Sequence, residues 1–290
     1  MTIRLITTKI KTALSIAAQR CMLTTAALSV CTTIGAQDGI DSTATMSPTI
    51  YTRSYMVGMG PVRLLDTYLS QEHFKGSGFT FLSTSEKRKG QRWFTMTEHQ
   101  ADISYTHDRS DNFNDISGIY KFYCGRLREW NKLYPGLTLR AGVMGMATLG
   151  FIYNTTAGNN PAQALAALQI MPTLGASYRF AAWGKPMMLR YEAQLPLAGL
   201  IFSPQYGQSY YEIFSKGDYD HNIVPTTMVA YPSFRQLITL DVGLCKHVSM
   251  RIGYLGDYEQ SDVNSIKHHI YSHRIMIGVV KSFQLIKHKP

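Results

Sequence analysis

RQLITLDVGLCKHVSMRIGYLGDYE, residues 235–259, decides the fold. Apolar residues occupy every second position on both sides of a short connector, CKHV at 245–248. The apolar set consists of Ile238, Leu240, Val242, Leu244, Met250, Ile252, Tyr254 and Tyr258. Between them lie Thr239, Asp241, Gly243, Ser249, Arg251, Gly253, Asp257 and Glu259. A period of two is the period of a β-strand, so the stretch predicts two strands joined by a tight turn.

The same period runs through most of the chain. The segments that carry it are 137–151, 165–180, 187–197 and 272–286, and less regularly 92–106 and 116–130. A soluble β-sandwich also alternates, but its polar face meets water. Here the polar face carries glycines and isolated charges, and the apolar face is nearly uncharged and ends in aromatic residues. This pattern predicts an all-β fold, a transmembrane antiparallel up-and-down β-barrel of 10 to 12 strands.

The first 36 residues have the composition of a secretory signal. Four basic residues and no acid precede or interrupt the apolar and small-residue run CMLTTAALSVCTTIG, and Ala36 offers a cleavage position. That run is shorter than the ~20 apolar residues of a transmembrane helix. We therefore expect a signal peptide at 1–36, a short periplasmic segment at 37–50 and the barrel at 51–290, reached by Sec-type export to the outer membrane.

Charge and cysteine content narrow the classes of function. The chain has 29 Lys and Arg against 19 Asp and Glu, and removing the four basic residues of the leader leaves 25 − 19 = +6. This charge is spread along the chain, with no basic block beyond 86–92, so nucleic-acid binding is not expected. Only Cys124 and Cys245 remain after the leader, which is too few for a disulfide scaffold; whether they pair stays open.

Connector lengths predict the orientation of the barrel. Short connectors at 86–91, 130–136, 181–186 and 245–248 alternate with longer ones at 106–115, 154–163, 200–234 and 257–267. In outer-membrane barrels short turns face the periplasm and longer loops face outward. Both chain ends are therefore expected in the periplasm, with 200–234 as a long extracellular loop. There are ten strands if 200–234 is a loop and twelve if it forms a hairpin of the wall.

Four stretches carry a family resemblance. They are SYMVGMGPVRLLDTYLS (54–70), GFIYNTTAGNNPAQA (150–164), LRYEAQLPLAGLIFSPQYGQSYYEIFSKGDYDHNIVPTT (189–227) and GYLGDYEQ (253–260). They resemble an uncharacterised outer-membrane β-barrel family of the Bacteroidetes, a domain of unknown function, over roughly residues 50–285. The resemblance implies an outer-membrane barrel, and it brings no established activity, ligand or catalytic residue.

The long loop holds the candidate binding residues. Exposed aromatic residues in such a loop suit a carbohydrate or peptide ligand, and the candidates are Tyr206, Tyr210, Tyr211 and Glu212. The run DYDHN offers Asp218, Asp220 and His221 as metal ligands, with Ca²⁺ as the ion. An EF-hand would need Gly at loop position six and Glu at twelve, where the chain has Ile223 and Val229. A turn with Asx hydrogen bonds is the alternative.

The polar face of the strands predicts a network inside the barrel. In a lumen of this size buried charges are expected to pair, which favours a structural network over a pore lining. The predicted members are Arg140, Arg179, Arg190, Glu192, Asp241, Arg251, Asp257, Glu259, His268 and Arg274.

Catalytic motifs are weak. His247 and Ser249 share a strand face, but at the periplasmic end, whereas a hydrolase of outer-leaflet lipid needs its nucleophile near the outer rim. His269, Tyr271 and His273 lie on the predicted lipid-facing side of their strand, near its outer end, where such an enzyme would need its catalytic residues. We expect a porin-like structural, ligand-binding or small-solute permeation protein of a Gram-negative outer membrane, with a lipid A or phospholipid acyl hydrolase as the alternative. Expected partners are outer-membrane lipid, lipopolysaccharide and, during biogenesis, the barrel-assembly machinery.

Overall fold

The computed structural model describes residues 49–90, 92–156, 158, 160–245 and 247–285. The predicted signal peptide, and all but the last two residues of the segment 37–50, lie outside these residues. The described part is all-β apart from one short turn of π-helix, η1 (Glu212–Lys216). Within it, no helix is long and apolar enough to cross a membrane.

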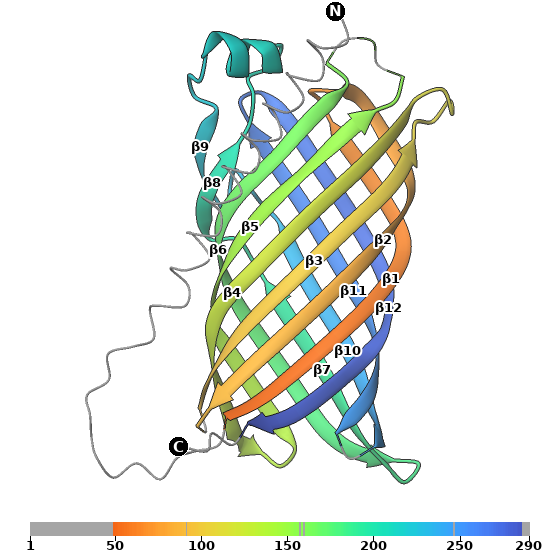
Figure 1. The fold of residues 1–290 in the computed structure, drawn as a ribbon, viewed down its shortest axis with the longest axis vertical. Coiled ribbons are helices and arrows are strands. Elements are labelled where there is room, and N and C mark those ends of the chain that lie inside the picture. Colours follow the sequence, from red (N-terminus) through yellow and green to blue (C-terminus); the bar gives the residue numbers. More distant parts are fainter. Residues whose placement is uncertain (1–48, 91, 157, 159, 246, 286–290) are drawn as a thin grey trace, which may run out of the picture. The chain divides into compact units, whose positions relative to one another are not determined.

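Twelve strands follow one another along the chain (Figure 1). They are β1 (Thr49–Asp66), β2 (Ser70–Lys89), β3 (Trp93–His107), β4 (Asn114–Tyr134), β5 (Leu137–Asn154), β6 (Ala162–Ala182), β7 (Lys185–Gln194), β8 (Ala198–Phe202), β9 (Ile223–Thr227), β10 (Phe234–Cys245), β11 (Val248–Val263) and β12 (Ile266–Leu285).

Ten of these strands close the barrel. The ring runs β1-β2-β3-β4-β5-β6-β7-β10-β11-β12 and returns to β1, with every pair antiparallel. The remaining two strands, β8 and β9, form a hairpin that pairs with β6 alone. The segment predicted as a loop or a hairpin at 200–234 therefore takes part in a hairpin, which spans 198–227. This hairpin is attached to the wall through β6 and does not enlarge the ring to twelve strands.

A proline interrupts the wall beside this hairpin. The lower part of β6 pairs with β7 and its upper part, Ala166–Ile170, pairs with β8. Between β7 and β8 the chain keeps two isolated backbone hydrogen bonds to β6, from Leu195 and Leu197. Pro196 lies between them and has no N–H to donate. The regular ladder stops there, and the chain leaves the ring for the long loop.

The two ends of the barrel differ in their connections. At one end the turns are short, and three of them contain a glycine with positive φ, Gly90, Gly136 and Gly184. The first and last described strands also meet at this end, since Thr49 pairs with Leu285. The other end carries the three longest connections between ring strands, 108–113, 155–161 and 195–233, and two short ones, 67–69 and 264–265. The long connector predicted at 257–267 is therefore wrong, because β11 and β12 extend to a two-residue turn. The end with the longest connections is the extracellular end by the rule for outer-membrane barrels.

The outer surface carries an apolar band between two levels of charge. On β1 the outward residues between Arg53 and Arg63 include Tyr55, Val57 and Met59, and Met59 is 68% exposed. Ten residues at ~3.3 Å rise and a strand tilt of ~40° span ~25 Å along the barrel axis. This equals the height of the apolar band of a transmembrane barrel. The exposed apolar side chains therefore face lipid.

The lumen is filled by side chains. Three apolar clusters lie inside the wall, and six methionines belong to them: Met56, Met96, Met144, Met146, Met171 and Met276. The upper cluster combines residues of five strands, Val62, Leu64, Phe74, Ile119, Ile152 and Ile270. Alternation alone predicts a polar inner face, so these apolar layers were not foreseen. Methionine fills irregular gaps well, which suits a narrow lumen that must also hold charged residues.

Candidate functional site

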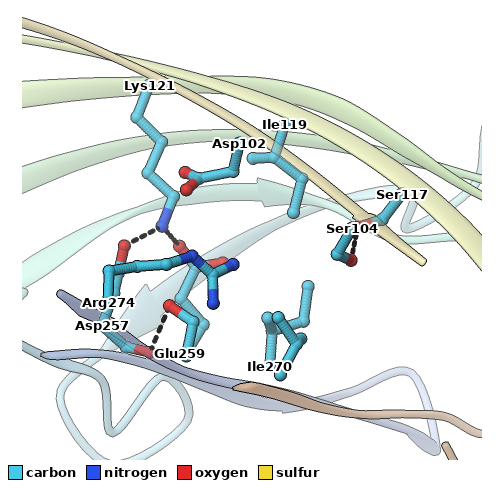
Figure 2. Close-up of a pocket in the computed structure, with 11 residues that line it drawn as sticks. Asp102, Ser104, Ser117, Ile119, Lys121, Asp257, Glu259, Ile270 and Arg274 are labelled. Atoms are coloured by element: carbon cyan, nitrogen blue, oxygen red, sulfur yellow. Dashed lines mark hydrogen bonds and ion pairs between the residues drawn. The ribbon is translucent and has the colours of Figure 1, made fainter. Parts of the chain in front are cut away.

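A polar cavity of about 20 Å³ lies within the lumen, close to the upper apolar cluster. Figure 2 shows Lys121 extending from one side of it toward Asp257 and Glu259 on the other. The Lys121 ammonium lies 2.6 Å from Asp257 Oδ2 and also forms an ion pair with Glu259. A volume of this size accommodates about one water molecule. The cavity is therefore a gap within a packed network and is too small for a solute.

Arg274 closes another side of this cavity. Its Nε donates to Thr80 Oγ1 at 3.0 Å, and its Nη1 donates to the carbonyl oxygens of Gly60 and Pro61, each at 3.0 Å. A Cβ on Gly78 would lie 2.6 Å from Arg274 Nη2. Glycine at position 78 thus leaves the space that the guanidinium occupies against the wall.

A second charged group surrounds Arg235. Its Nε donates to Gln100 Oε1 at 3.0 Å, its Nη1 donates to Gln194 Oε1 at 2.9 Å, and its Nη2 lies 2.9 Å from Glu98 Oε1. The guanidinium also lies over the ring of Tyr123, 4.8 Å from its centroid. Glu98 is completely buried, and a buried carboxylate is tolerated when it is paired in this way.

The network continues toward the periplasmic end. Glu86 accepts from Arg140 Nη1 at 3.0 Å and also pairs with Arg190. Arg251 forms a two-point ion pair with Asp241, with nitrogen–oxygen distances of 2.5 and 2.7 Å. Fork-to-carboxylate pairs of this kind are the strongest of the common charged hydrogen bonds. They tie neighbouring and facing strands together through the interior.

Nine of the ten residues predicted for the lumen are buried: Arg140, Arg190, Glu192, Asp241, Arg251, Asp257, Glu259, His268 and Arg274. The exception is Arg179, which is exposed because it lies near the end of β6, beyond the packed part of the lumen. Its assignment to the network is corrected accordingly. His268 pairs with Asp66 at 2.8 Å.

Sequence reasoning missed several members, namely Asp66, Glu86, Glu98, Lys121, Glu129 and Arg235. Most of them lie on β1–β4, where the alternation is less regular. The signal that could have found them is the alternation of inward and outward positions along each strand. Each shares the inward face with a neighbour two residues away, as Glu98 does with Met96 and Gln100.

The buried strand residues contain more acids than bases. The bases are Lys121, Arg140, Arg190, Arg235, Arg251 and Arg274, six in number. The acids are Asp66, Glu86, Glu98, Asp115, Glu129, Glu192, Asp241, Asp257 and Glu259, nine in number. Among the described buried strand residues the acids therefore outnumber the bases, although the chain as a whole is basic. His268 and the partly buried Arg88 add two further basic groups, paired with Asp66 and Glu129.

The loop 203–222 crosses the extracellular mouth. Tyr210 donates its hydroxyl to Gln163 Oε1 on β6 at 2.8 Å and accepts the backbone N–H of Ala164 at 2.7 Å. The hydroxyl of Tyr68, in the β1–β2 turn, donates to the carbonyl oxygen of Gln208 at 2.9 Å. Strands β1 and β6 are five positions apart in the ring of ten, on opposite sides of the barrel. The loop thus forms a cap over the mouth.

The other end of this cap is held by Asn264, in the β11–β12 turn. Its amide donates to the carbonyl oxygens of Ser203 and His221 at 3.0 and 2.9 Å. Within the cap, Glu212 accepts from the backbone N–H and the hydroxyl of Ser209, and these bonds lower the pKa of Glu212. Burial, with Asp66 and Glu212 nearby, raises the pKa of Tyr68.

The four candidate binding residues of the cap fall into two groups. Tyr206 and Tyr211 are 59% and 65% exposed, and Lys216 lies over the ring of Tyr211, 5.8 Å from its centroid. Tyr210 and Glu212 hold the cap itself, through the hydrogen bonds described above. Two of the four predicted binding residues are therefore exposed, and the other two stabilise the cap on which they lie. Ligand binding by these residues stays a prediction.

The candidate metal ligands lie on the outer side of the cap. Asp220 Oδ1 lies 2.7 Å from His221 Nδ1, and both side chains are largely exposed. His221 has positive φ, as in a tight turn. Within the described residues no group of three or more His, Cys, Asp or Glu is arranged to hold a metal. A calcium site at Asp218, Asp220 and His221 therefore stays a prediction.

The lipid-facing histidines contact tyrosines. His273 Nδ1 lies 2.6 Å from the hydroxyl of Tyr254 and 3.4 Å from that of Tyr258. His269 stacks on Tyr271. These contacts place a polar aromatic cluster on β11 and β12 and give His273 no serine partner.

Cys124 and Cys245 lie on β4 and β10, which are not neighbours in the wall.

A closed antiparallel barrel with an apolar outer band, long loops at one end and charged residues inside defines an outer-membrane β-barrel protein. The chain belongs to the family described as "Protein of unknown function (DUF3316)", whose family profile matches residues 21–290. No curated protein matches the chain.

Solved structures similar to this chain include three outer-membrane proteins. Neisserial surface protein A shares 10% identity, with 81% of this chain and 97% of that chain covered and a TM-score of 0.32. The transport unit of the autotransporter AIDA-I from Escherichia coli shares 7%, with 89% and 97% covered and a TM-score of 0.40. The translocator domain of the autotransporter NalP from Neisseria meningitidis shares 12%, with 92% and 96% covered and a TM-score of 0.38.

Proposed function

We propose that this protein is a closed outer-membrane barrel with a structural or ligand-binding role, which holds the cap at 203–222 on the cell exterior. The burial of its inner side chains carries the proposal. Glu98 and Gln100 on β3, Met144 and Ile152 on β5, and Met276 on β12 face the lumen from three strands and are each 0% exposed. A water-filled channel would leave such side chains accessible. The charged groups inside tie the wall together and do not line a pore.

The route to the membrane belongs to this proposal. A basic leader followed by small and apolar residues supports Sec-type export, and assembly would then need the barrel-assembly machinery. The stretches that resemble Bacteroidetes outer-membrane barrels support an origin in that group. Lipopolysaccharide and outer-membrane lipid would surround the apolar band.

The ligand-binding side of the proposal rests on Tyr206 and Tyr211. Both are exposed on a loop that several hydrogen bonds hold in place, and rigid aromatic residues bind carbohydrate or peptide at low entropic cost. Calcium at Asp218, Asp220 and His221 would strengthen the same segment. Addition of EDTA tests that point, because loss of a bound ion would increase the rate of proteolysis within 203–222.

Permeation is the second candidate, favoured by the excess of acids among the described buried strand residues. If the cap and the ion pairs moved aside, this excess would favour cations over anions. In the closed arrangement the same residues block the path, so permeation requires a rearrangement of the lumen.

Reconstitution in planar bilayers tests the proposal. Purified mature protein is expected to give no stable conductance, while an open porin inserted in the same way gives defined steps. Stable steps from the wild-type protein would overturn the closed-lumen proposal, and their ion selectivity would test the permeation candidate. A second assay measures release of fatty acid from lipid A or phospholipid in micelles, with and without Ca²⁺. Release would overturn the proposal of a structural or ligand-binding role and support the acyl hydrolase alternative.

A further inference from the structure

One sector of the outer wall carries a row of basic side chains that lie in register on neighbouring strands. Arg63 on β1 lies opposite Lys75 on β2, and Lys75 lies opposite His107 on β3. On the other side, Arg63 lies opposite Tyr271 on β12. Arg63, Lys75 and His107 are exposed, and all four side chains have the outward parity of their strands. Strands β12, β1, β2 and β3 are consecutive in the ring.

The row lies immediately above the apolar band. Toward the membrane centre, beyond Pro61 on β1 and Ser77 on β2, the outward residues include Met59 on β1 and Phe79 on β2, and Tyr105 follows on β3, all of them exposed. The row is at the end of the barrel with the long connections, which faces outward in outer-membrane barrels. It therefore lies where the head groups of the outer leaflet begin.

Arg63 and Lys75 lack protein partners among the described residues. No described carboxylate lies within 4.0 Å of either charge, and neither lies over a described aromatic ring. The cations at the periplasmic end differ, since Arg53 lies over Phe283 and Lys87 lies over Tyr51. His107 Nδ1 lies 3.0 Å from Asp111 Oδ1. The two uncompensated charges of the row are therefore Arg63 and Lys75.

The neighbouring sector provides an internal comparison. Asn114 on β4 pairs in register with His107. Thr155 follows beyond it, and its backbone N–H donates to the carbonyl oxygen of Asn114 at 2.8 Å. Neither residue is charged. The row of basic residues in register thus ends at β3 on this side.

We propose that Arg63 and Lys75, with Tyr271 and His107 at their sides, bind the phosphate groups of lipid A, the anionic glycolipid of the outer leaflet. This inference rests on the proposed outer-membrane location. Arginine matches a phosphate with two parallel N–H groups, and lysine adds a point charge. Cations placed above an apolar surface suit an amphiphile whose acyl chains lie along Phe79 and Met59 while its phosphates meet the row.

Binding of lipid A to the purified mature protein in detergent micelles tests this site. Replacing both cations, Arg63→Gln with Lys75→Gln, is expected to weaken binding of diphosphoryl lipid A about thirtyfold, because each of the two basic residues contributes about 1 kcal/mol near an anionic surface. The matched control replaces the same residue types on the same strands at the periplasmic end, Arg53→Gln with Lys87→Gln, and is expected to bind like the wild type. All four side chains face outward, and an unchanged urea midpoint would show that both variants fold.

Each remaining outcome decides the proposal. Equal weakening in both double variants would show a general charge effect and overturn the site, and so would no weakening in the first. Equal binding of dephosphorylated lipid A would assign the contact to acyl chains alone. Competition by inorganic phosphate at millimolar concentration would identify a free-phosphate site. None of these measurements depends on conductance, so failure here leaves the closed-lumen proposal standing, and a conducting wild type leaves this site standing.

Discussion

Lys121 Nζ lies 2.6 Å from Asp257 Oδ2, and the two residues come from opposite sides of the barrel. Strands β4 and β11 are five positions apart in the ring of ten. The pair therefore spans the interior, and Gln100 on β3 adds a hydrogen bond to the same carboxylate at 2.9 Å. A barrel whose opposite walls meet through buried ion pairs is closed by its own side chains.

The first prediction concerns this pair. Lys121→Met removes the cation that faces Asp257 and Glu259 and leaves two buried carboxylates without it. Breaking a buried pair from one side costs about 3–5 kcal/mol, so the free energy of unfolding in urea should fall by about that amount. Lys87→Met, on an exposed lysine at the periplasmic end, should change it by less than about 0.5 kcal/mol.

A triple variant separates the pair from simple packing. Lys121→Met combined with Asp257→Asn and Glu259→Gln removes the uncompensated charges and should recover much of the lost stability. If the triple variant is less stable than Lys121→Met alone, the carboxylates have other partners and the cross-lumen pair is not what holds this level of the barrel.

The second prediction concerns the attachment of the cap. Tyr210→Phe leaves Gln163 Oε1 and the backbone N–H of Ala164 without their shared partner. Leaving buried polar groups unsatisfied costs about 1–3 kcal/mol, so proteolysis within 203–222 should accelerate roughly tenfold or more. Tyr206→Phe, at an exposed tyrosine of the same loop, is the control and should not change the rate. Equal rates for all three proteins would mean that the cap is held elsewhere.

The third prediction is the pH range in which the cap stays closed. Burial and nearby acids raise the pKa of Tyr68, so its contribution is complete below about pH 10 and is lost as pH rises through the raised value. Hydrogen bonds from Ser209 lower the pKa of Glu212, so its contribution is present above about pH 4.5 and is lost as pH falls through the lowered value. Proteolysis within 203–222 should be slowest between these limits. The alkaline limb should weaken in Tyr68→Phe and the acid limb in Glu212→Gln.

Much of the fold follows from the sequence because the period of two is a local property. Alternation assigns each residue of β10, β11 and β12 to a face, and connector lengths give the orientation. The choice between ten and twelve strands depends on which strands the hairpin segments pair with, and a local sequence pattern does not contain that information. Both segments of the hairpin have strand character, yet β8 and β9 have five residues each, and Pro196 interrupts the ladder before them.

The network inside the barrel was less predictable than the fold, because its ion pairs and hydrogen bonds join residues that are far apart in the sequence. The alternation of faces along the strand places Asp257 and Arg251 inside, but Lys121 lies 136 residues from Asp257 in the chain. Arg179 shows the opposite limit, since its parity is inward and its position near the strand end leaves it in solvent. Tyr210 was identified as a loop residue of interest, while its role in attaching the cap depends on Gln163, 47 residues away.

The last prediction tests where the membrane lies. Ile277 on β12 faces outward opposite Val57 and Ile252, about midway between the levels of Arg53 and Arg63. An arginine at the bilayer midplane costs about 2–4 kcal/mol, and one near the interface costs about 0–1 kcal/mol. Ile277→Arg should therefore destabilise the protein folded in lipid vesicles by the larger of these two amounts. Ser77→Arg, two residues from Lys75 on the same outward face, should destabilise it by the smaller amount. Equal costs at the two positions would place the bilayer elsewhere on the barrel, and with it the boundary that puts Arg63 and Lys75 at the lipid phosphates.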